Sequence, residues 1–474
     1  MVIRPLRTAA RRRSMLAVLL AGQAMASIDA SIVSVAAQTI RHGLQATDAE
    51  IQLVVSGYLL TTGVLFVTCA RIGEVIGHRR AFLTGLGWFT AASLLCGISV
   101  NPAMLIVSRI AQAVGAALLT PQVFSLIHLQ WAGAQRRRAI GLYSMVLALG
   151  VALGQICGGL VAGSDLLGLS WRPVFLINVP IGVVVLAFGL RRLPGSPGGV
   201  EPKRLDLAGV GLLTAAMTAI TLPLIFGGSQ SWPTWTWLML ASGGLLLGIF
   251  GRYEARARQP VLDLAALKRR DLQFGLVACC IVMGCYTVFL LTLTLHLQSY
   301  LGYTPLQAGL AFIPYTIGFG VVSLSWSACP RRVRGALPIA GPLVYATGMF
   351  VLVLVSREEW NPLGCTALLL TAGAGHAAGY SPLIAQVTSR VEPELASAVS
   401  ALNSTGPVLA EVVAVAGLGS LYFAAPTSAD GLLRLAVAIT ALLVVAAVCA
   451  TLAILVHTRR DTRHPSWAMS TKRE

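Results

Sequence analysis

Long apolar runs separated by short polar turns dominate the pattern along this 474-residue chain. About 20 consecutive apolar residues in a helix are enough to cross the hydrocarbon layer of a membrane. The pattern predicts fourteen such spans, joined by connections too short to form a soluble domain. The expected spans are 14–40, 51–70, 80–99, 102–128, 139–163, 172–190, 205–227, 234–252, 272–298, 306–327, 335–355, 362–387, 396–422 and 430–457.

The composition leads to the same class of protein. Hydrophobic residues make up 56% of the chain and charged residues only 11%, whereas a soluble globular domain carries about 25% charged residues. We therefore expect an all-α polytopic membrane protein. The nine cysteines are scattered and include no CxxC pair, which favours packing roles over a metal site or a disulfide framework.

The basic residues predict how the spans are oriented. Thirty of the 35 Lys and Arg residues fall in the two tails and in every second turn, which predicts that both termini are cytoplasmic. The same alternation favours residues 11–40 as the first span over a cleaved signal peptide ending near Ala24-Met25-Ala26. The net charge of +17 is then expected to serve topology and contact with anionic lipid, with no nucleic-acid partner.

Two weak internal echoes suggest a repeat. "AALLTP" (116–121) resembles "AAGYSP" (377–382), and "GVALGQ" (150–155) resembles "GPVLAE" (406–411), in the same order and eight spans apart. Parallel repeats of this kind in transporters place the substrate site between the two halves. The predicted organisation is a cytoplasmic N-tail 1–13, a six-helix half 14–190, two inserted helices 205–252, a second six-helix half 272–457 and a cytoplasmic C-tail 458–474.

Few ionisable residues lie inside the spans, and each costs about 2.5–3.5 kcal/mol if it faces lipid. They are Asp29, Arg109, His296, His376 and Glu411. Asp29 and Arg109 are expected at similar depths, so they can form an ion pair. Two interpretations remain open: the pair fixes the first helix to the fourth, or it takes part in substrate or proton coupling. A lone histidine in a membrane helix is more often a hydrogen-bonded packing residue, although His376 is also a tentative cavity residue.

A polar stripe follows the first span at helical spacing, while Asp29 points to nearly the opposite side. The stripe fits either a water-filled substrate cavity or hydrogen bonding between helices. Its members are Gln23, Ser27, Ser31, Ser34 and Gln38.

Glu411 has no basic residue one helical turn away. A buried carboxylate without a cation takes up a proton readily and can be neutral near physiological pH. Arg109, by contrast, would hold Asp29 ionised until the two separate. Glu411 is therefore the candidate standing proton carrier, and Asp29 the candidate switch.

Several segments resemble motifs of the major facilitator superfamily, specifically of its fourteen-helix drug:proton antiporters, which include actinobacterial antibiotic exporters. "SIDASIVSVAAQTI" (27–40) is similar to the first-helix motif, with Asp29 as its acid, and "SRIAQAVGAALLTP" (108–121) to the fourth-helix motif, with Arg109. "ARIGEVIGHRRAF" (70–82) is similar to the loop motif, "GVALGQICGG" (150–159) to the antiporter motif and "SWRPVFLINVPIG" (170–182) to a segment of the fourteen-helix branch. The residues singled out in these three motifs are Glu74, which stands where an aspartate is usual, and Gly77, Arg79, Arg80, Gly150, Gly154, Gly158, Trp171, Arg172 and Asn178.

The resemblance implies a major facilitator fold of fourteen helices (6 + 2 + 6) and a part for Arg109 in proton coupling. This chain departs from the family at several positions. His78 stands where an arginine is usual, Gln155 where a proline is usual, and Glu411 where small residues are more common. By the same comparison, Glu411 faces either the cavity or the seam between the halves.

From these observations we expect a proton-coupled exporter (an antiporter) of hydrophobic or amphipathic drugs or antibiotics in the bacterial cytoplasmic membrane. The alternatives are a dedicated exporter of one endogenous metabolite and an importer of the same fold. The sequence contains neither a GxxxxGK[ST] loop nor a catalytic cluster, so we expect neither ATP drive within this chain nor an enzyme. We expect no cofactor and no metal, with the proton gradient as energy source. The chain is expected to be a monomer whose partners are substrate, protons and membrane lipid.

Overall fold

The computed structural model describes residues 9–163, 168–194, 206–257, 260, 262, 267–356, 359–389 and 396–463. All regular structure in these residues is helical. The first group of helices is α1 (Ala9–Leu44), α2 (Asp48–Ile76), α3 (His78–Gly97), α4 (Pro102–Gln130), α5 (Gly133–Gly163), α6 (Pro173–Leu176) and α7 (Asn178–Arg192). They are followed by α8 (Leu207–Phe226), α9 (Thr234–Glu254), α10 (Arg270–Ser299), α11 (Pro305–Ala311), α12 (Ile313–Ser325), α13 (Arg331–Val355), α14 (Pro362–Ser389), α15 (Ala396–Phe423) and α16 (Ser428–Arg463).

Each expected span coincides, within a few residues, with one helix or with two consecutive helices. Span 172–190 is divided at Ile177 into α6 and α7, and span 306–327 is divided at Phe312 into α11 and α12. Within the described residues, eleven helices are long and apolar enough to cross a membrane. The total of fourteen spans therefore remains a prediction, and the expected tails lie mostly outside the described residues.

Local sequence signals account for several helix ends. Thr47 and Glu50 form a capping box at the start of α2, as Thr304 and Gln307 do at the start of α11. Gly77 joins α2 to α3 with a φ of 92°, a conformation that glycine adopts without the strain of a side chain.

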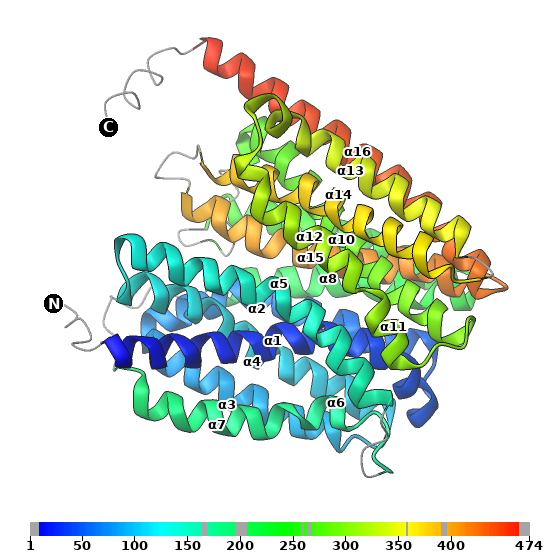
Figure 1. The fold of residues 1–474 in the computed structure, drawn as a ribbon, viewed down its shortest axis with the longest axis horizontal. Coiled ribbons are helices and arrows are strands. Elements are labelled where there is room, and N and C mark those ends of the chain that lie inside the picture. Colours follow the sequence, from blue (N-terminus) through cyan, green and yellow to red (C-terminus); the bar gives the residue numbers. More distant parts are fainter. Residues whose placement is uncertain are drawn as a thin grey trace.

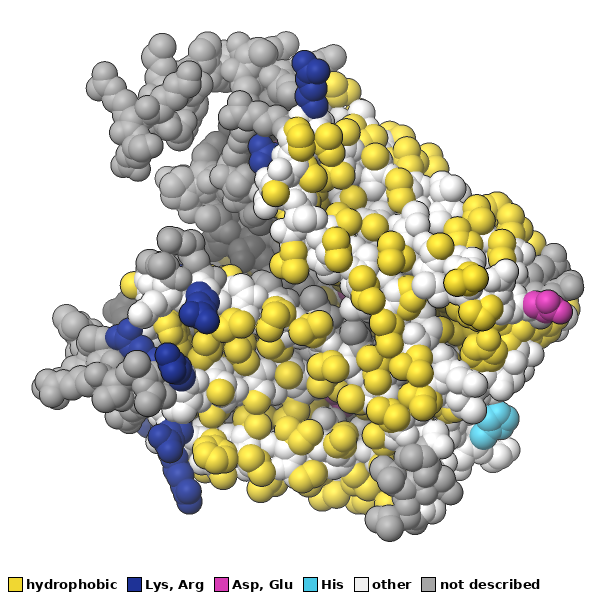
Figure 2. All heavy atoms as spheres, in the orientation of Figure 1, with side chains coloured by type: hydrophobic (Ala, Val, Ile, Leu, Met, Phe, Trp, Pro, Cys, Tyr) yellow, Lys and Arg dark blue, Asp and Glu magenta, His cyan; other side chains and the backbone are white. Residues whose placement is uncertain are grey.

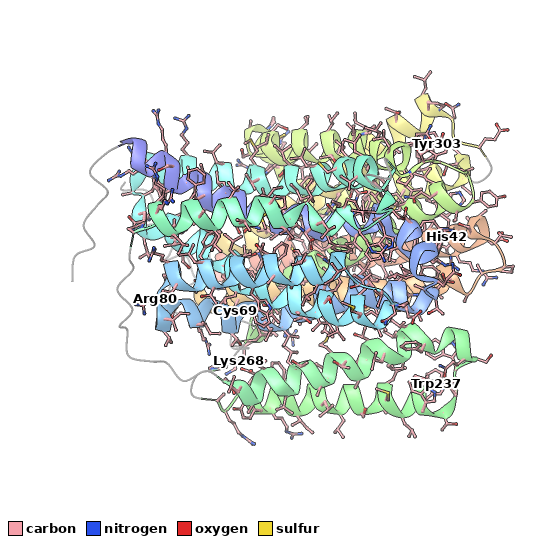
Figure 3. The ribbon with its side chains drawn as sticks, turned by 90° about the horizontal axis from the view of Figure 1, so that it is seen from below. His42, Cys69, Arg80, Trp237, Lys268 and Tyr303 are labelled. Carbon is pink, nitrogen blue, oxygen red and sulfur yellow. The ribbon has the colours of Figure 1, made fainter. Side chains whose placement is uncertain are left out.

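The helices form two bundles and a separate hairpin (Figure 1). The N-terminal bundle contains α1–α7 and the C-terminal bundle contains α10–α16. The hairpin of α8 and α9 lies beside them (Figure 3). Its helix α8 contacts both α2 and α15, and Leu213 and Met217 of α8 belong to one apolar cluster with Val64 of α2 and Leu402 of α15. The bundles meet along two seams, one where α2 contacts α15 and one where α5 contacts α11 and α12. The hairpin of α8 and α9 therefore covers the first of these seams.

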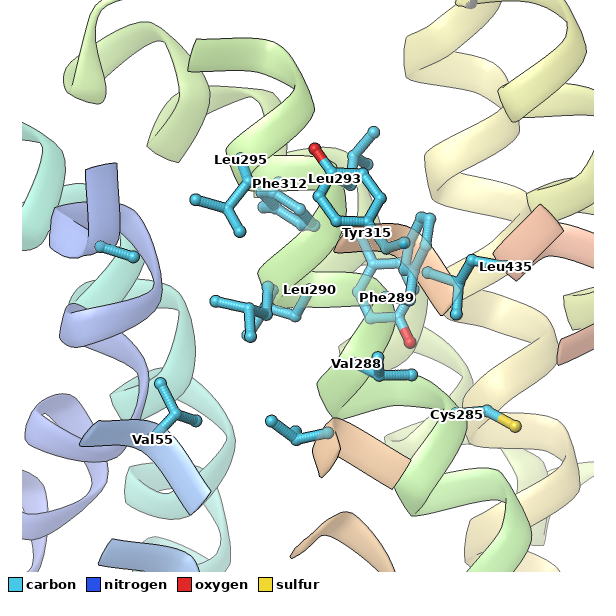
Figure 4. Packing of buried hydrophobic residues seen from close by; sticks show 14 of the residues in the cluster. Val55, Cys285, Val288, Phe289, Leu290, Leu293, Leu295, Phe312, Tyr315 and Leu435 are labelled. Atoms are coloured by element: carbon cyan, nitrogen blue, oxygen red, sulfur yellow. The ribbon is translucent and has the colours of Figure 1, made fainter. Parts of the chain in front are cut away.

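The bundles meet at one end and spread apart at the end where both termini lie (Figure 1). At the closed end, Gln298 of α10 donates to the Val35 carbonyl of α1 at 2.8 Å. Gly309 of α11 lies so close to the Gln155 carbonyl of α5 that only a glycine fits. Leu290 points from α10 toward the N-terminal bundle, where Val55 lies (Figure 4). The contact between the bundles is thus concentrated at one end.

The surface divides into an apolar flank and charged ends. Figure 2 shows hydrophobic side chains over the sides of both bundles and Lys and Arg side chains near the end where the termini lie. Arg80 and Lys268 lie at that end, whereas His42 and Tyr303 lie at the opposite one (Figure 3). Exposed residues on the flank include Val107 (66%), Leu238 (67%) and Leu324 (83%). An apolar surface of this extent suits contact with lipid.

Helices α1 and α5 pack closely along the glycines of the predicted antiporter motif. Gly150 lies against Ser27, Gly154 against Ser31 and the Ile28 carbonyl, and Gly158 against Ile32. Lipid tails provide no hydrophobic drive between helices, so such close approach contributes through van der Waals contact.

The α1–α5 contact gives a stability prediction. A Cβ atom at residue 154 would lie 2.5 Å from the Ile28 carbonyl oxygen, so Gly154→Ala should destabilise the protein by about 1–3 kcal/mol through overpacking. Gly141→Ala in the same helix is the matched control, because nothing lies within 4 Å of its added methyl group. Thermal unfolding of the purified variants measures both, and equal unfolding temperatures would contradict the prediction.

Candidate functional site

A buried ion pair lies in the interior of the N-terminal bundle. Arg109 Nη1 of α4 donates to Asp29 Oδ2 of α1 at 2.6 Å. The Asp29 side chain is 0% exposed and that of Arg109 is 1% exposed. The structure therefore contains the expected contact, on the side of α1 opposite its polar stripe.

Two amide side chains complete the shell of Asp29. Gln112 Nε2 and Asn178 Nδ2 each donate to Oδ1 of Asp29 at 2.9 Å. Gln112 is held by α3, because its Nε2 also donates to Ser93 Oγ at 2.8 Å. The Oε1 atom of Gln112 accepts a hydrogen bond from Arg109, in the same helix α4, at 2.5 Å. Three donors from α4 and α7 thus point at one carboxylate and fill acceptor positions on both of its oxygens.

Aromatic rings cover the guanidinium group of Arg109. Its Cζ atom lies 4.1 Å from the ring centre of Tyr58 of α2 and 5.6 Å from that of Phe175 of α6. Stacking of a guanidinium on such rings is favourable where water is excluded. The charge of Arg109 is therefore compensated by the carboxylate and by the rings together.

The segment 170–182 builds one side of this site. Trp171 is fully buried against Gly43 near the end of α1, and Arg172 donates to the Ser99 carbonyl at 3.3 Å. These contacts anchor α6, which presents Phe175 to Arg109, and α7 then begins at Asn178, which bonds Asp29. The segment that most specifically resembles the fourteen-helix branch is thus the one that completes the shell of Asp29.

The polar stripe of α1 faces α5. Ser27 and Ser31 pack on the α5 glycines, Gln23 donates to Ser27 at 3.2 Å, and Gln155 of α5 donates to the Ser31 carbonyl at 3.2 Å. Ser34 is also buried. Ser27 and Ser31 thus pack against α5, and the hydrogen bond between the two helices at this place is accepted by the Ser31 backbone carbonyl.

Gln38, the last residue of the stripe, lies at the closed end of the molecule. It bonds His42 at 2.9 Å and lines a cavity of about 140 Å³ between α1–α2 and the C-terminal bundle. The ion pair of Arg41 and Asp48, at 3.0 Å, borders the same cavity.

The junction between α2 and α3 is held by hydrogen bonds to two neighbouring helices, α4 and α7. His78 Nδ1 lies 2.7 Å from Gln122 Oε1 of α4, and Gln122 Nε2 donates to the Cys69 carbonyl at 2.8 Å. Arg79 donates to the Leu190 carbonyl of α7 at 2.8 Å. Glu74 and Arg80 are exposed, and neither forms an ion pair with another described residue.

Glu411 of α15 belongs to the C-terminal bundle and interacts electrostatically with Tyr286 and Cys280 of α10 and Tyr380 of α14. The Thr287 hydroxyl also interacts with its carboxyl group. These neighbours all belong to the C-terminal bundle, so Asp29 and Glu411 lie in separate bundles.

The two histidines occupy different surroundings in the C-terminal bundle. His296 bonds Ser428 at 3.1 Å and the Ser356 carbonyl at 3.4 Å, so it has the contacts of a packing residue. His376 is 3% exposed, bonds the Tyr315 hydroxyl at 2.6 Å and is surrounded by aromatic rings. Within the described part of the chain, no group of three His, Cys, Asp or Glu residues could hold a metal ion.

Sequence reasoning missed Gln112, Tyr58 and Gln122. Gln112 follows Arg109 by three residues and therefore shares its helix face, which was the one available signal. Tyr58 and Gln122 act across helices, so only the packing reveals them.

The buried pair gives a second stability prediction. Arg109→Met alone leaves an uncompensated carboxylate and should destabilise the protein by about 3–5 kcal/mol. The double variant Asp29→Asn, Arg109→Met removes both charges and should be more stable than the single variant. A double-mutant cycle by thermal unfolding tests this, and purely additive effects would count against the coupling.

Comparison with known proteins places the chain in a family. The model of the Major Facilitator Superfamily matches residues 19–415. The chain is 32% identical over 422 residues to the probable actinorhodin transporter of Streptomyces coelicolor, covering 87% of this chain and 73% of that protein. It is also 30% identical over 408 residues to the drug efflux pump JefA of Mycobacterium tuberculosis. That match covers 84% of this chain and 78% of JefA.

The fold agrees with solved transporters. A bacterial homologue of the human lysosomal transporter Spinster, in an inward-facing and occupied conformation, matches with a TM-score of 0.67 at 17% identity, over 95% of this chain and 98% of that one. The chain is a transporter rather than an enzyme, with many apolar helices in the cytoplasmic membrane. It belongs to the Major Facilitator Superfamily.

Proposed function

We propose that this chain is a proton-coupled exporter of hydrophobic or amphipathic drugs or antibiotics. In this proposal fourteen spans are arranged as 6 + 2 + 6, both termini are cytoplasmic, and the two bundles alternate access to a site between them. The names of the relatives support export, since one is called an actinorhodin transporter and another a drug efflux pump. The charge asymmetry along the chain supports the orientation.

The shell of Asp29 carries the proposal. Its carboxylate accepts hydrogen bonds from Arg109, Gln112 and Asn178. A protonated carboxyl group loses its attraction to Arg109 and becomes a donor that faces other donors. Proton uptake therefore competes with this packing of α1 against α4 and α7, so a proton binds best to another arrangement of these helices. Such a difference in affinity between states is what coupling requires.

Glu411 supplies a second protonation site in this proposal. None of the described ion pairs includes Glu411, and its carboxyl group interacts electrostatically with Tyr286 and Tyr380. A carboxylate in such surroundings is stabilised by a proton or by a cation from outside the protein. In our mechanism, Asp29 acts as the switch and Glu411 as the standing carrier.

The direction of opening fits the same scheme. The bundles converge at the end of His42 and Tyr303, and both termini lie at the other end (Figures 1 and 3). With cytoplasmic termini, this arrangement corresponds to a state closed toward the outside. A proton that enters from outside then moves down a membrane potential worth about 2.3 kcal/mol per charge at 100 mV.

The alternative is a dedicated exporter of one endogenous metabolite. The relative named for actinorhodin favours it, whereas the relative named as a drug efflux pump favours a broader range. A drug-susceptibility panel separates the two, because a dedicated exporter protects its host against a single compound.

The panel also tests the coupling. An efflux-deficient bacterial host that expresses the chain should export the compound against which the chain protects it. A proton uncoupler should abolish that export. Asp29→Asn and Glu411→Gln should each lower export at least tenfold at unchanged expression, while Glu359→Gln, at an exposed glutamate, serves as the control. Uncoupler-insensitive export, or full activity in both variants, would contradict proton antiport.

The proposed topology predicts which residues are accessible from outside. A cysteine at position 303 should react with a membrane-impermeant maleimide in intact cells, because Tyr303 lies at the end expected to face outward (Figure 3). A cysteine at position 80 should react only after the membrane is opened. The parent chain measures the labelling of native cysteines, and the reverse pattern would invert the orientation.

A further inference from the structure

The cavity at the closed end of the molecule has walls from both bundles. Gln38 and Arg41 of α1 and Asp48 and Ile51 of α2 form the wall on the side of the N-terminal bundle. The opposite wall consists of the ends of α10 and α15 and of residues 425–428, which lead into α16. The cavity therefore depends on the contact that the two bundles make at this end.

The volume of the cavity suits a single ring. A protein cavity of about 150 Å³ holds one benzene molecule, and this cavity has a volume of about 140 Å³. Its apolar lining includes Ile51, Leu295 and Phe423, and Leu295 points from α10 toward the N-terminal bundle (Figure 4). An aromatic ring among these side chains would bury apolar surface on both sides and lie beside the ring of Phe423.

One polar atom of the lining has no partner. Gln38 Nε2 lies 2.9 Å from His42 Nε2, but Gln38 Oε1 is buried and accepts no hydrogen bond. A buried acceptor without a donor costs about 1–3 kcal/mol. A ligand that brings a hydroxyl group to this atom would supply the missing donor.

The charged residues of the lining compensate each other. Arg41 Nη1 lies 3.0 Å from Asp48 Oδ1, and no other lining residue is charged. A charged ligand would therefore leave its own charge without a partner, which is costly in a partly buried place. Arg41 and Asp48 are 40% and 36% exposed, so an uncharged ligand can reach the cavity from solvent at this end.

We propose that this cavity is a binding site for a small uncharged phenol. The ring would lie among Ile51, Leu295 and Phe423, and the phenol hydroxyl group would donate to Gln38 Oε1. Because the ligand would contact both bundles, its binding favours the arrangement in which they meet at this end. A bound phenol would therefore oppose the opening of the closed end and act as an inhibitor of transport.

This inference goes beyond the proposed function, because the ligand is not the transported compound. The lining includes neither Asp29 nor Glu411. Binding is measured without transport, so the result for this site does not depend on whether the chain exports a drug.

4-Fluorophenol is the probe, and fluorine NMR follows its binding to the purified chain in lipid nanodiscs. Empty nanodiscs measure its uptake into lipid. Ala425 lines the cavity, so Ala425→Phe should place a ring inside it and weaken the affinity at least tenfold. Ala424→Phe is the matched control, because Ala424 is exposed and does not line the cavity; its affinity should stay within twofold of the parent.

A second variant tests the polar contact. Gln38→Met keeps the length of the side chain and removes its acceptor, so it should weaken the binding of 4-fluorophenol at least threefold. The affinity for fluorobenzene, which has no hydroxyl group, should change less than twofold. Thermal unfolding shows whether each variant is folded, and equal losses for the two compounds in Gln38→Met would contradict the assigned hydrogen bond.

Hydrogen exchange and a larger competitor locate the ligand. In the parent, 4-fluorophenol should slow amide exchange in residues 46–52 and 421–428, which belong to opposite walls, and it should leave Ala425→Phe unchanged. 1-Naphthol is more hydrophobic but has two rings, so it should not compete. If Ala425→Phe fails to fold, Gln38→Met and the exchange pattern decide. Uptake that does not saturate, equal competition by 1-naphthol or parent-like binding by folded Ala425→Phe would overturn the site.

Discussion

The N-terminal bundle is organised around the need to neutralise one carboxylate in its interior. Asp29 is completely buried, and removing a charge from water costs several kcal/mol unless partners compensate it. Arg109 supplies the opposite charge, while Gln112 and Asn178 fill the remaining acceptor positions. These partners come from α4 and α7, so the position of Asp29 constrains the packing of three helices at once.

The two bundles treat their buried acids differently. In the N-terminal bundle, Asp29 is saturated by protein donors and paired with a cation. In the C-terminal bundle, Glu411 interacts with the Thr287 hydroxyl and electrostatically with Tyr286 and Tyr380, and none of the described ion pairs includes it. The interiors of the two bundles are thus chemically unlike.

The helices and the central ion pair could be predicted from the sequence for simple reasons. Apolar runs of the right length have few other structures, and Asp29 and Arg109 are among a handful of charges inside them. The side that each helix presents was harder to predict. A stripe such as Ser27 and Ser31 suits water or a neighbouring helix equally well, and only the close approach of Gly150 and Gly154 decides between them. The aromatic group around His376 was not predictable, because its rings come from four different helices whose relative rotation the sequence does not give.

The hairpin of α8 and α9 removes the approximate symmetry between the two seams of the molecule. Helix α8 contacts both α2 and α15, which also contact each other directly, while α5 contacts α11 and α12 at the second seam. Any rotation of one bundle against the other must therefore shear α8 along at least one of its neighbours. Resistance to such a movement is therefore unequal: both seams consist of helices in direct contact, but the seam of α2 and α15 carries the additional contacts of α8.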